Sequence, residues 1–294
     1  SAVASDHVVM GDNGTITYVP MGLTGAGLPW TYETTDTLAV TGGIDRITVG
    51  DGNNTVLGGM GGDFITTDTG TANAGRDTIL GDNGIIEMDV EGNNFARVAT
   101  KSLSTIGGAV SATMLSLGGN DTIIAGIGEK RVLGGDGSDS ITLGAGDHTV
   151  LGDNGVVTYV ALGNVGAGNA LKFETTDTLD VNTTPVGGTG AADSIIITGD
   201  GNNTILGGMG GDTIRLKNGA DTVMGDNGVV EMDAVGVKFA RITTKSQTSA
   251  GGGTTDLGGD DDILALDGTK IVLGGDGGDT IKLGDGSAVA SDHV

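Results

Sequence analysis

Single aspartates recur at one fixed position of a glycine-rich motif of nine residues, G-G-x-G-x-D-x-U-x, in which U is a large aliphatic residue. The clearest copies are residues 58–66, 134–142, 207–215 and 274–282. Ca2+ is bound by carboxylate and carbonyl oxygens, and glycine turns its carbonyls inward at little steric cost. Each motif therefore predicts a turn that binds calcium, followed by a short strand.

The spacing of these aspartates predicts that they stack. If one coil takes two motifs, aspartates 18 residues apart lie on one side, as in the pairs Asp45/Asp63, Asp121/Asp139 and Asp261/Asp279. The pair Asp193/Asp212 is longer by a single position, which we interpret as a β-bulge. The predicted calcium ligands on this side are Asp45, Asp63, Asp121, Asp139, Asp193, Asp212, Asp261 and Asp279.

The motifs in between are degenerate and predict a different second edge. Only Asp77 and Asp221 keep the aspartate there, and we expect partial calcium sites at these two. The other positions hold Asn54, Lys130, His148, Asn203, Lys270 and His293. A lysine ammonium cannot bind calcium but can replace it by pairing with carboxylates. We expect an edge held by hydrogen bonds and ion pairs; alternatively, several of its turns bind nothing.

The tetrapeptide Gly-Asp-Asn-Gly begins at Gly11, Gly81, Gly152 and Gly225, so that blocks of nearly equal length follow one another. Its aspartates take the place of the second glycine of the motif. They either cap the calcium row, which we favour, or form tight turns only. These further candidate ligands are Asp12, Asp82, Asp153 and Asp226.

Blocks of two types alternate, so the internal unit is a pair of blocks, and the chain contains this pair twice. This predicts two continuous solenoid segments, residues 1–151 and 152–294. Residues 1–8 and 287–294 are identical, SAVASDHV. We interpret this identity as a window on a longer tandem array; a duplicated cloning end is the alternative.

The predicted fold is all-β with essentially no helix. Segments such as 55–57, 78–80, 122–124 and 140–142 read as short strands between glycine turns. Residues 85–90 with 95–100, and 229–233 with 238–243, predict wider strands or hairpins that leave the regular coil. Residues 14–35 look least regular; they and 155–176 are candidate lateral contact surfaces. About 16 coils at ~4.8 Å each predict a rod of roughly 75 Å per 286 residues.

Charge and composition exclude several classes of protein. With 38 acidic and 14 basic residues the net charge is −24, which disfavours nucleic acid and anionic membranes and favours cations. There is no cysteine for disulfides and no stretch of 18 apolar residues, so we expect no membrane insertion. Aromatic residues make up 3% of the chain, which suits a thin core of β-branched residues.

The nine-residue motifs resemble the RTX, or haemolysin-type, calcium-binding repeats of secreted bacterial proteins. The resemblance implies a right-handed parallel β-roll that folds when it binds several Ca2+ ions, and export by type I secretion to the cell surface or beyond. It assigns the metal to the eight stacked aspartates. Family members usually carry the roll beside another module, whereas repeats fill the whole of this sequence.

Three functions compete. Catalysis is disfavoured because the histidines, His7, His148 and His293, sit at degenerate turns without a patterned nucleophile. A ligand-binding module for glycan, mineral or ice is the alternative: threonines flank the aspartates, and Trp30, Tyr18, Tyr32 and Tyr159 are the aromatic candidates. An accessory module of a secreted enzyme ranks lower. We favour a calcium-stabilised structural repeat of an extracellular fibre, sheath, surface layer or adhesin stalk. Its expected partners are further copies of itself and a surface glycan or matrix.

Overall fold

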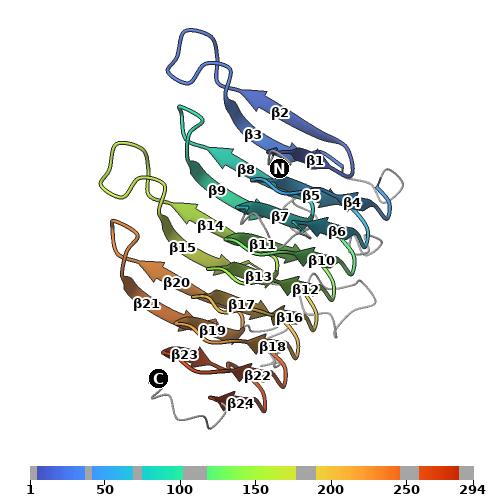
Figure 1. Ribbon diagram of the computed structural model, residues 1–294, viewed down its shortest axis with the longest axis vertical. Helices are drawn as coiled ribbons and strands as arrows, with labels where there is room; N and C mark the ends of the chain where they lie inside the picture. The colour runs from blue at the N-terminus through green and yellow to red at the C-terminus, as the bar shows by residue number, and fades with distance from the viewer. Residues whose placement is uncertain are drawn as a thin grey trace, which may run out of the picture.

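Three eight-stranded β-sheets make up the part of the chain that the computed structural model describes, which is residues 5–36, 42–68, 75–101, 118–176, 190–245 and 258–284. None of these residues is helical, as the sequence predicted. Sheets A and C are parallel throughout, whereas sheet B consists of four antiparallel hairpins side by side. The strands stack along the long axis of the molecule (Figure 1).

Strands are numbered along the chain. Sheet A contains, in order, β1 (Val8–Met10), β5 (Thr55–Gly59), β7 (Asp77–Asp82), β11 (Lys130–Gly135), β13 (Thr149–Asp153), β17 (Thr204–Gly208), β19 (Asp221–Asp226) and β23 (Lys270–Leu273). Sheet C contains β4 (Arg46–Thr48), β6 (Phe64–Thr67), β10 (Thr122–Ala125), β12 (Ser140–Leu143), β16 (Ser194–Ile197), β18 (Thr213–Leu216), β22 (Asp262–Ala265) and β24 (Thr280–Leu283). Sheet B contains β2 (Gly14–Tyr18), β3 (Pro29–Thr34), β8 (Gly84–Met88), β9 (Phe95–Thr100), β14 (Gly155–Tyr159), β15 (Ala170–Thr175), β20 (Gly228–Met232) and β21 (Phe239–Thr244).

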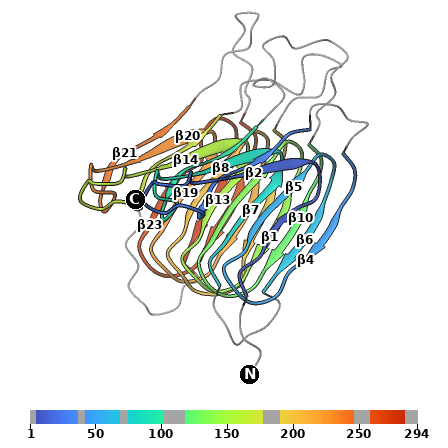
Figure 2. The same cartoon turned by 90° about the horizontal axis from the view of Figure 1, so that it is seen from above.

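The chain alternates between sheets A and C, and every second passage from A to C includes a hairpin of sheet B. We call one A strand with the C strand that follows it a level. A short turn joins β5 directly to β6, whereas β7 reaches β10 only after the hairpin β8–β9. Viewed along the stack, the hairpins lie together on one side of the A and C strands (Figure 2). All three sheets continue across residues 151 and 152, since both residues lie in β13.

Sheet A is the middle layer, because consecutive residues of its strands point into two different cores. Val132 packs with isoleucines of sheet C, while its neighbour Leu133 packs against the hairpins of sheet B. The A–C core contains only aliphatic residues, as the scarcity of aromatic residues predicted. The A–B core adds Tyr32, Tyr159 and Phe173. The hydrophobic pairs at the start of each A strand thus hold three layers together.

Several sequence predictions are confirmed and three are wrong. The short strands at 55–57, 78–80, 122–124 and 140–142 are present, and the segments around 85–100 and 229–243 are hairpins. Residues 14–35 are more regular than predicted, because they form the hairpin β2–β3, and the connection at residues 19–28 lacks strand structure. No bulge separates Asp193 from Asp212, since β16 and β18 pair without a shift. The extra residue lies in the connection from β16 to β17, which is longer by one position than the connection from β12 to β13.

The predicted number of coils is also wrong. Sheets A and C each contain eight described strands, and therefore eight levels rather than 16. The number of levels was overestimated from the motif spacing, because the residues of each hairpin lengthen the chain without adding a level. Eight levels at ~4.8 Å span roughly 38 Å, about half the predicted length.

Candidate metal centre

One row of aspartates runs along the turns that lead from sheet A to sheet C. We call these turns the acidic edge. In each of seven consecutive pairs, Oδ1 of one aspartate accepts a hydrogen bond of 2.6–3.1 Å from the backbone N–H of the aspartate one level earlier. The structure thus brings together all eight predicted ligands on this side: Asp45, Asp63, Asp121, Asp139, Asp193, Asp212, Asp261 and Asp279.

The second oxygen of these carboxylates is the unusual feature. Oδ2 is buried without a hydrogen-bond partner in six of the eight: Asp45, Asp63, Asp121, Asp139, Asp212 and Asp261. Buried polar atoms are almost always paired in native proteins. Six such oxygens at equivalent positions are therefore a regular feature of this edge.

Glycine carbonyl oxygens lie beside the unpaired carboxylate oxygens. A β-carbon built on Gly134 would clash with both Asp139 Oδ2 and the Gly152 carbonyl oxygen. The same pair of oxygens meets at Gly81, with Asp121 Oδ2 and the Gly134 carbonyl. Glycine is thus required where A strands end, because any side chain would fill the place where these two oxygens converge.

Burial of the row disfavours the ionised form of its carboxyl groups. Burial raises the pKa of Asp63 and of Asp261 to about 7 and that of Asp121 to about 9, and repulsion from neighbouring carboxylates adds to each shift. Burial also raises the pKa of Asp139 and Asp212 well above the usual value. A row of this kind gains stability from any positive charge it can bind.

The donor atoms fit Ca2+, which prefers oxygen ligands in flexible geometry and accepts backbone carbonyls. Six levels each supply one carboxylate with an unpaired oxygen and one neighbouring glycine carbonyl, so a bound ion would need ligands from adjacent levels. Among the described residues, no three acidic or histidine side chains surround a single point. The carbonyls are thus an essential part of any calcium site on this edge.

The aspartates of the Gly-Asp-Asn-Gly turns lie beside the row but are already hydrogen-bonded. They occupy the place of the second glycine, as predicted: Asp82 pairs with Gly59 and Asp153 with Gly135. Asp82 accepts backbone N–H groups from Gly119 and Asp136 with its two oxygens. Asp12, Asp153 and Asp226 also accept backbone N–H groups. Burial raises the pKa of Asp226 to about 8, with repulsion from Asp261 adding to the shift.

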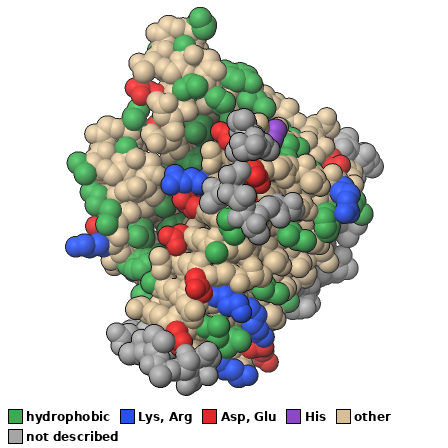
Figure 3. All heavy atoms as spheres, viewed as in Figure 1, with side chains coloured by type: hydrophobic (Ala, Val, Ile, Leu, Met, Phe, Trp, Pro, Cys, Tyr) green, Lys and Arg blue, Asp and Glu red, His purple; other side chains and the backbone are tan. Residues whose placement is uncertain are grey.

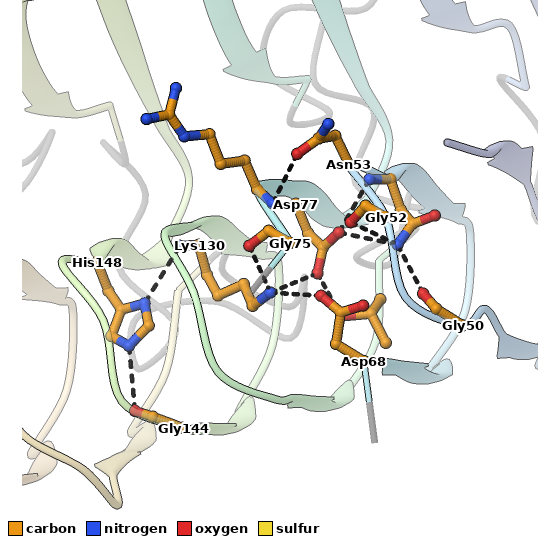
Figure 4. Close-up of polar contacts among 12 residues, drawn as sticks. Gly50, Gly52, Asn53, Asp68, Gly75, Asp77, Lys130, Gly144 and His148 are labelled. Carbon is orange, nitrogen blue, oxygen red and sulfur yellow. Dashed lines mark hydrogen bonds and ion pairs between the residues drawn. The ribbon is translucent and has the colours of Figure 1, made fainter. Parts of the chain in front are cut away.

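The opposite turns, which lead from sheet C to sheet A, form what we call the lysine edge. Here Lys130 is fully buried, and its Nζ lies 2.6 Å from Asp68 Oδ2, 2.8 Å from Asp77 Oδ2 and 2.9 Å from the Gly75 carbonyl oxygen (Figure 4). The prediction that lysine pairs with acidic groups on this edge is confirmed. Burial raises the pKa of Asp68 to about 6; at Asp77, hydrogen bonds from Asp68 and Lys130 outweigh burial and lower the pKa.

Lys270 occupies the equivalent place in the second half of the chain. It is also fully buried and pairs with Asp221 Oδ2 at 2.7 Å, and the carbonyls of Gly219 and Asp267 accept its other protons at 2.7 and 3.0 Å. Asp77 and Asp221, predicted as partial calcium sites, thus each direct one oxygen at an ammonium group. Their role as calcium ligands stays a prediction.

Sequence reasoning missed Asp68. It lies after β6, and its counterpart in the second half is Lys217, so the repeat pattern gave no reason to select it. Asp68 is the one non-glycine residue with positive φ, 48°, among the described residues. That strained conformation brings the carboxylate to Lys130, and a positive φ cannot be read from the motif.

Amide and imidazole groups complete the lysine edge. The side-chain amide of Asn54 donates to Asp77 Oδ1 at 2.9 Å, and that of Asn203 donates to Asp221 Oδ1 at 2.8 Å. His148 Nδ1 accepts the Lys130 backbone N–H at 3.2 Å, and its Nε2–H faces the Gly144 carbonyl at 3.2 Å. Burial lowers the pKa of His148 to about 4. His293 lies outside the described residues.

The threonines considered for an ice or mineral surface do not share one face. Thr122, Thr213 and Thr280 belong to sheet C, whereas Thr55, Thr78, Thr204 and Thr222 belong to sheet A, and Thr78 and Thr222 are buried there. Thr37 and Thr178 lie outside the described residues. On the face shown in Figure 3, uncharged polar side chains and backbone cover most of the surface, with charged groups scattered among them.

A scan against protein-family models and searches of curated proteins and of solved structures found no match to this chain. No helix among the described residues is long and apolar enough to cross a membrane. The two edges and the repetition along the stack are therefore the features that bear on function.

Proposed function

We propose that this chain is a calcium-stabilised structural repeat of an extracellular fibre, sheath, surface layer or adhesin stalk. The observation that carries the proposal is the row of six buried, unpaired carboxylate oxygens along the acidic edge. An enzyme places its reactive groups once, around one substrate. A group repeated at successive levels instead serves the stack itself.

Calcium binding and folding would be one event in this proposal. Eight carboxylates in a row repel one another, and the net charge of −24 adds to that repulsion. Calcium ions between the levels would neutralise the row and supply partners to the Oδ2 atoms. Since the ligands come together only in the folded chain, the binding free energy becomes folding free energy. The chain would stay expanded at low calcium, as in a cytosol, and fold outside the cell.

The finer architecture that we propose is a right-handed parallel β-roll of the RTX type, which carries a third sheet of hairpins. Two observations support it: the nine-residue motifs coincide with the turns from sheet A to sheet C, and the chain passes alternately between these parallel sheets. Type I export to the bacterial surface follows from the resemblance. Both ring nitrogens of His148 make structural contacts, which favours a structural over a catalytic role.

Electron microscopy in millimolar calcium and in excess chelator tests the proposal. We expect ordered rods in calcium and their loss on chelation, with titration calorimetry giving several ions per chain. Magnesium is the matched control, because Mg2+ demands a tighter, octahedral set of ligands and replaces its waters reluctantly. Particles that are equally compact in both solutions, with no calcium bound, would disprove the calcium mechanism.

A glycan site is the second candidate, and one groove favours it. Tyr18, Trp30, Thr17, Thr31 and Glu87 line an open groove of about 500 Å3 near the tips of the first hairpins. Exposed aromatic rings beside a carboxylate and hydroxyls suit a sugar. Trp30 is the chain's single tryptophan, so its fluorescence reports directly on this groove. A glycan that changes it saturably, and fails to do so in the Glu87→Gln variant, would support the site.

A further inference from the structure

The two ends of the stack expose edge strands of all three sheets. One end, which we call the head face, consists of β1, β2 and β4; the other, the tail face, consists of β21, β23 and β24. These strands lie at opposite extremes of the long axis (Figure 1). Unprotected edge strands present unpaired backbone groups and tend to join other strands. The question is which strands would fit here.

One contact inside the molecule shows which strands fit such an end, and we call this contact the internal joint. It is the place where the first half of the chain meets the second, through the pairs β11–β13, β12–β16 and β9–β14. The tail face repeats the first member of each pair and the head face repeats the second. Lys270 in β23 is the counterpart of Lys130 in β11, and the Gly-Asp-Asn-Gly turn aligns β1 with β13.

Exposure at the ends differs from exposure at the internal joint. Ile141 is fully buried there, while its tail-face counterpart Ile281 is 41% exposed. Tyr159 is 6% exposed at the joint, where its ring lies 5.6 Å from that of Phe95. Its head-face counterpart Tyr18 is 56% exposed. Both ends thus leave uncovered the apolar side chains that the internal joint buries.

Hydrogen-bonding groups at the two ends are complementary halves of the internal ladders. At the internal joint the Asp139 N–H donates to Asp193 Oδ1 at 2.6 Å. The tail face ends with the N–H of Asp279, and the head face begins with Oδ1 of Asp45. Neither group has a ladder partner among the residues described.

A second ladder of hydrogen bonds, in which threonine hydroxyls accept glycine N–H groups, also breaks off at both ends. The Thr100 hydroxyl accepts the N–H of Gly155 at 2.9 Å, as Thr34 does for Gly84 and Thr175 for Gly228. The tail face continues this series with Thr244, and the head face continues it with Gly14. Two separate ladders therefore break off at both ends in a form that would join.

We propose that the head face of a second copy of this unit docks on the tail face in the register of the internal joint. This rests on the proposed structural function and adds the partner surface to it. In that register, Val9 and Met10 lie opposite Val272 and Leu273, as Val150 and Leu151 lie opposite Val132 and Leu133. The contact uses two different surfaces, so it does not close on itself and extends into a linear array.

One substitution makes the proposed joint more apolar than its template. The Arg131 guanidinium stacks on the rings of Phe95 and Tyr159, with its central carbon 4.8 and 5.3 Å from the ring centres. The corresponding tail-face residues are Ile271 and Phe239, and Tyr18 comes from the head face. In the proposed joint, Ile271 would lie between the ring of Phe239 and the ring of Tyr18 from the second copy.

Engineered cysteines test the register, since the natural chain has none. Thr280 and Arg46 are both exposed on sheet C and correspond to Ser140 and Ser194, which pair at the internal joint. Adjacent strands are ~4.8 Å apart, within the roughly 4.4–6.8 Å between Cα atoms that a disulfide spans. Thr280→Cys and Arg46→Cys chains, mixed in calcium and oxidised, should give a covalent dimer, whereas either chain alone should not.

Matched controls separate this inference from the proposed function. A Ser140→Cys/Ser194→Cys chain should form its disulfide internally, which reports on the fold alone. The mixture of Lys282→Cys with Arg46→Cys is two residues out of register and should link at least tenfold less. If the internal disulfide forms but Thr280→Cys and Arg46→Cys do not link above the shifted pair, in the full chain or in one ending at residue 286, the docking inference is wrong. Equal linking of either variant with itself would also overturn it.

Discussion

The acidic edge and the lysine edge solve the same electrostatic problem in different ways. Both close a stack of parallel strands with turns that contain buried carboxylates. On the lysine edge Lys130 and Lys270 supply the positive charge within the chain, at distances of 2.6–2.8 Å from their carboxylates. On the acidic edge, six carboxylates have an Oδ2 atom with no hydrogen-bond partner. Under the proposed calcium mechanism, the lysine edge can fold by itself, whereas the acidic edge depends on a cation from solution.

Without calcium, protonation of the aspartates should stabilise the acidic edge, and this is the largest expected effect. An aspartate titrates near 3.8 when unfolded, whereas the folded pKa is about 7 for Asp63 and Asp261 and about 9 for Asp121. Their contribution to stability is therefore fully present below about pH 4 and is lost as the pH rises through 7 to 9. In excess chelator we expect the melting temperature to fall by on the order of 10 °C or more between pH 5 and pH 8.

Circular dichroism melts at both pH values, with calcium and with chelator, measure this effect. In saturating calcium the trend should be absent or reversed, because protons then compete with the metal. A chelated protein whose stability rises between pH 5 and pH 8 would show that the acidic row does not control folding.

Removal of the Lys270 ammonium group should have the next largest effect on stability. Lys270→Met leaves the buried Asp221 carboxylate without its counter-ion, which costs about 3–5 kcal/mol. The double variant Lys270→Met/Asp221→Asn removes both charges and should regain most of that loss. Urea unfolding in saturating calcium measures both. Equal destabilisation of the single and double variants would mean that Lys270 acts by packing and not as the counter-ion.

Sequence alone predicted the contrast between the edges because charge type is visible in the motif. Lys130 and Lys270 stood where aspartate was expected, and the regular spacing of the motifs placed Asp121 above Asp139. The hydrogen-bond ladder and the unpaired Oδ2 atoms could not be predicted, since they depend on the orientation of each carboxylate. Asp68 was missed for the same reason. The number of levels was wrong because a motif count does not show which residues leave the stack to form hairpins.

A neutral substitution within the acidic row should have opposite effects with and without calcium. Asp139→Asn keeps an oxygen to accept the Asp121 N–H and removes one buried negative charge. In chelator at pH 8 we expect stabilisation of about 1–3 kcal/mol, since an unpaired buried charge is lost. In calcium we expect at least tenfold weaker binding at the adjoining levels, a loss of about 1.4 kcal/mol or more.

The sign change is the informative result, and calorimetry together with urea unfolding measures it. Asp6→Asn, an exposed acidic residue at a turn outside the row, is the matched control and should change neither quantity. Destabilisation of Asp139→Asn in both solutions would indicate that Asp139 is held by hydrogen bonds alone.

The smallest effect should come from His148. As the pH falls, protonation of His148 destabilises the folded protein, whereas protonation of the acidic edge stabilises it. Burial lowers its folded pKa to about 4, against 6.5 for an unfolded histidine, so its contribution to stability is lost as the pH falls from 6.5 towards 4.

His148→Asn places there the residue found at Asn54 and Asn203, and should change stability at pH 8 by less than about 1 kcal/mol. In chelator the variant should gain more stability than the parent between pH 6.5 and pH 4.5, because the opposing titration is gone. Melting curves at these two pH values measure the difference. An identical pH response in parent and variant would show that His148 does not titrate within the lysine edge, and that the acidic row alone sets the response of the protein to acid.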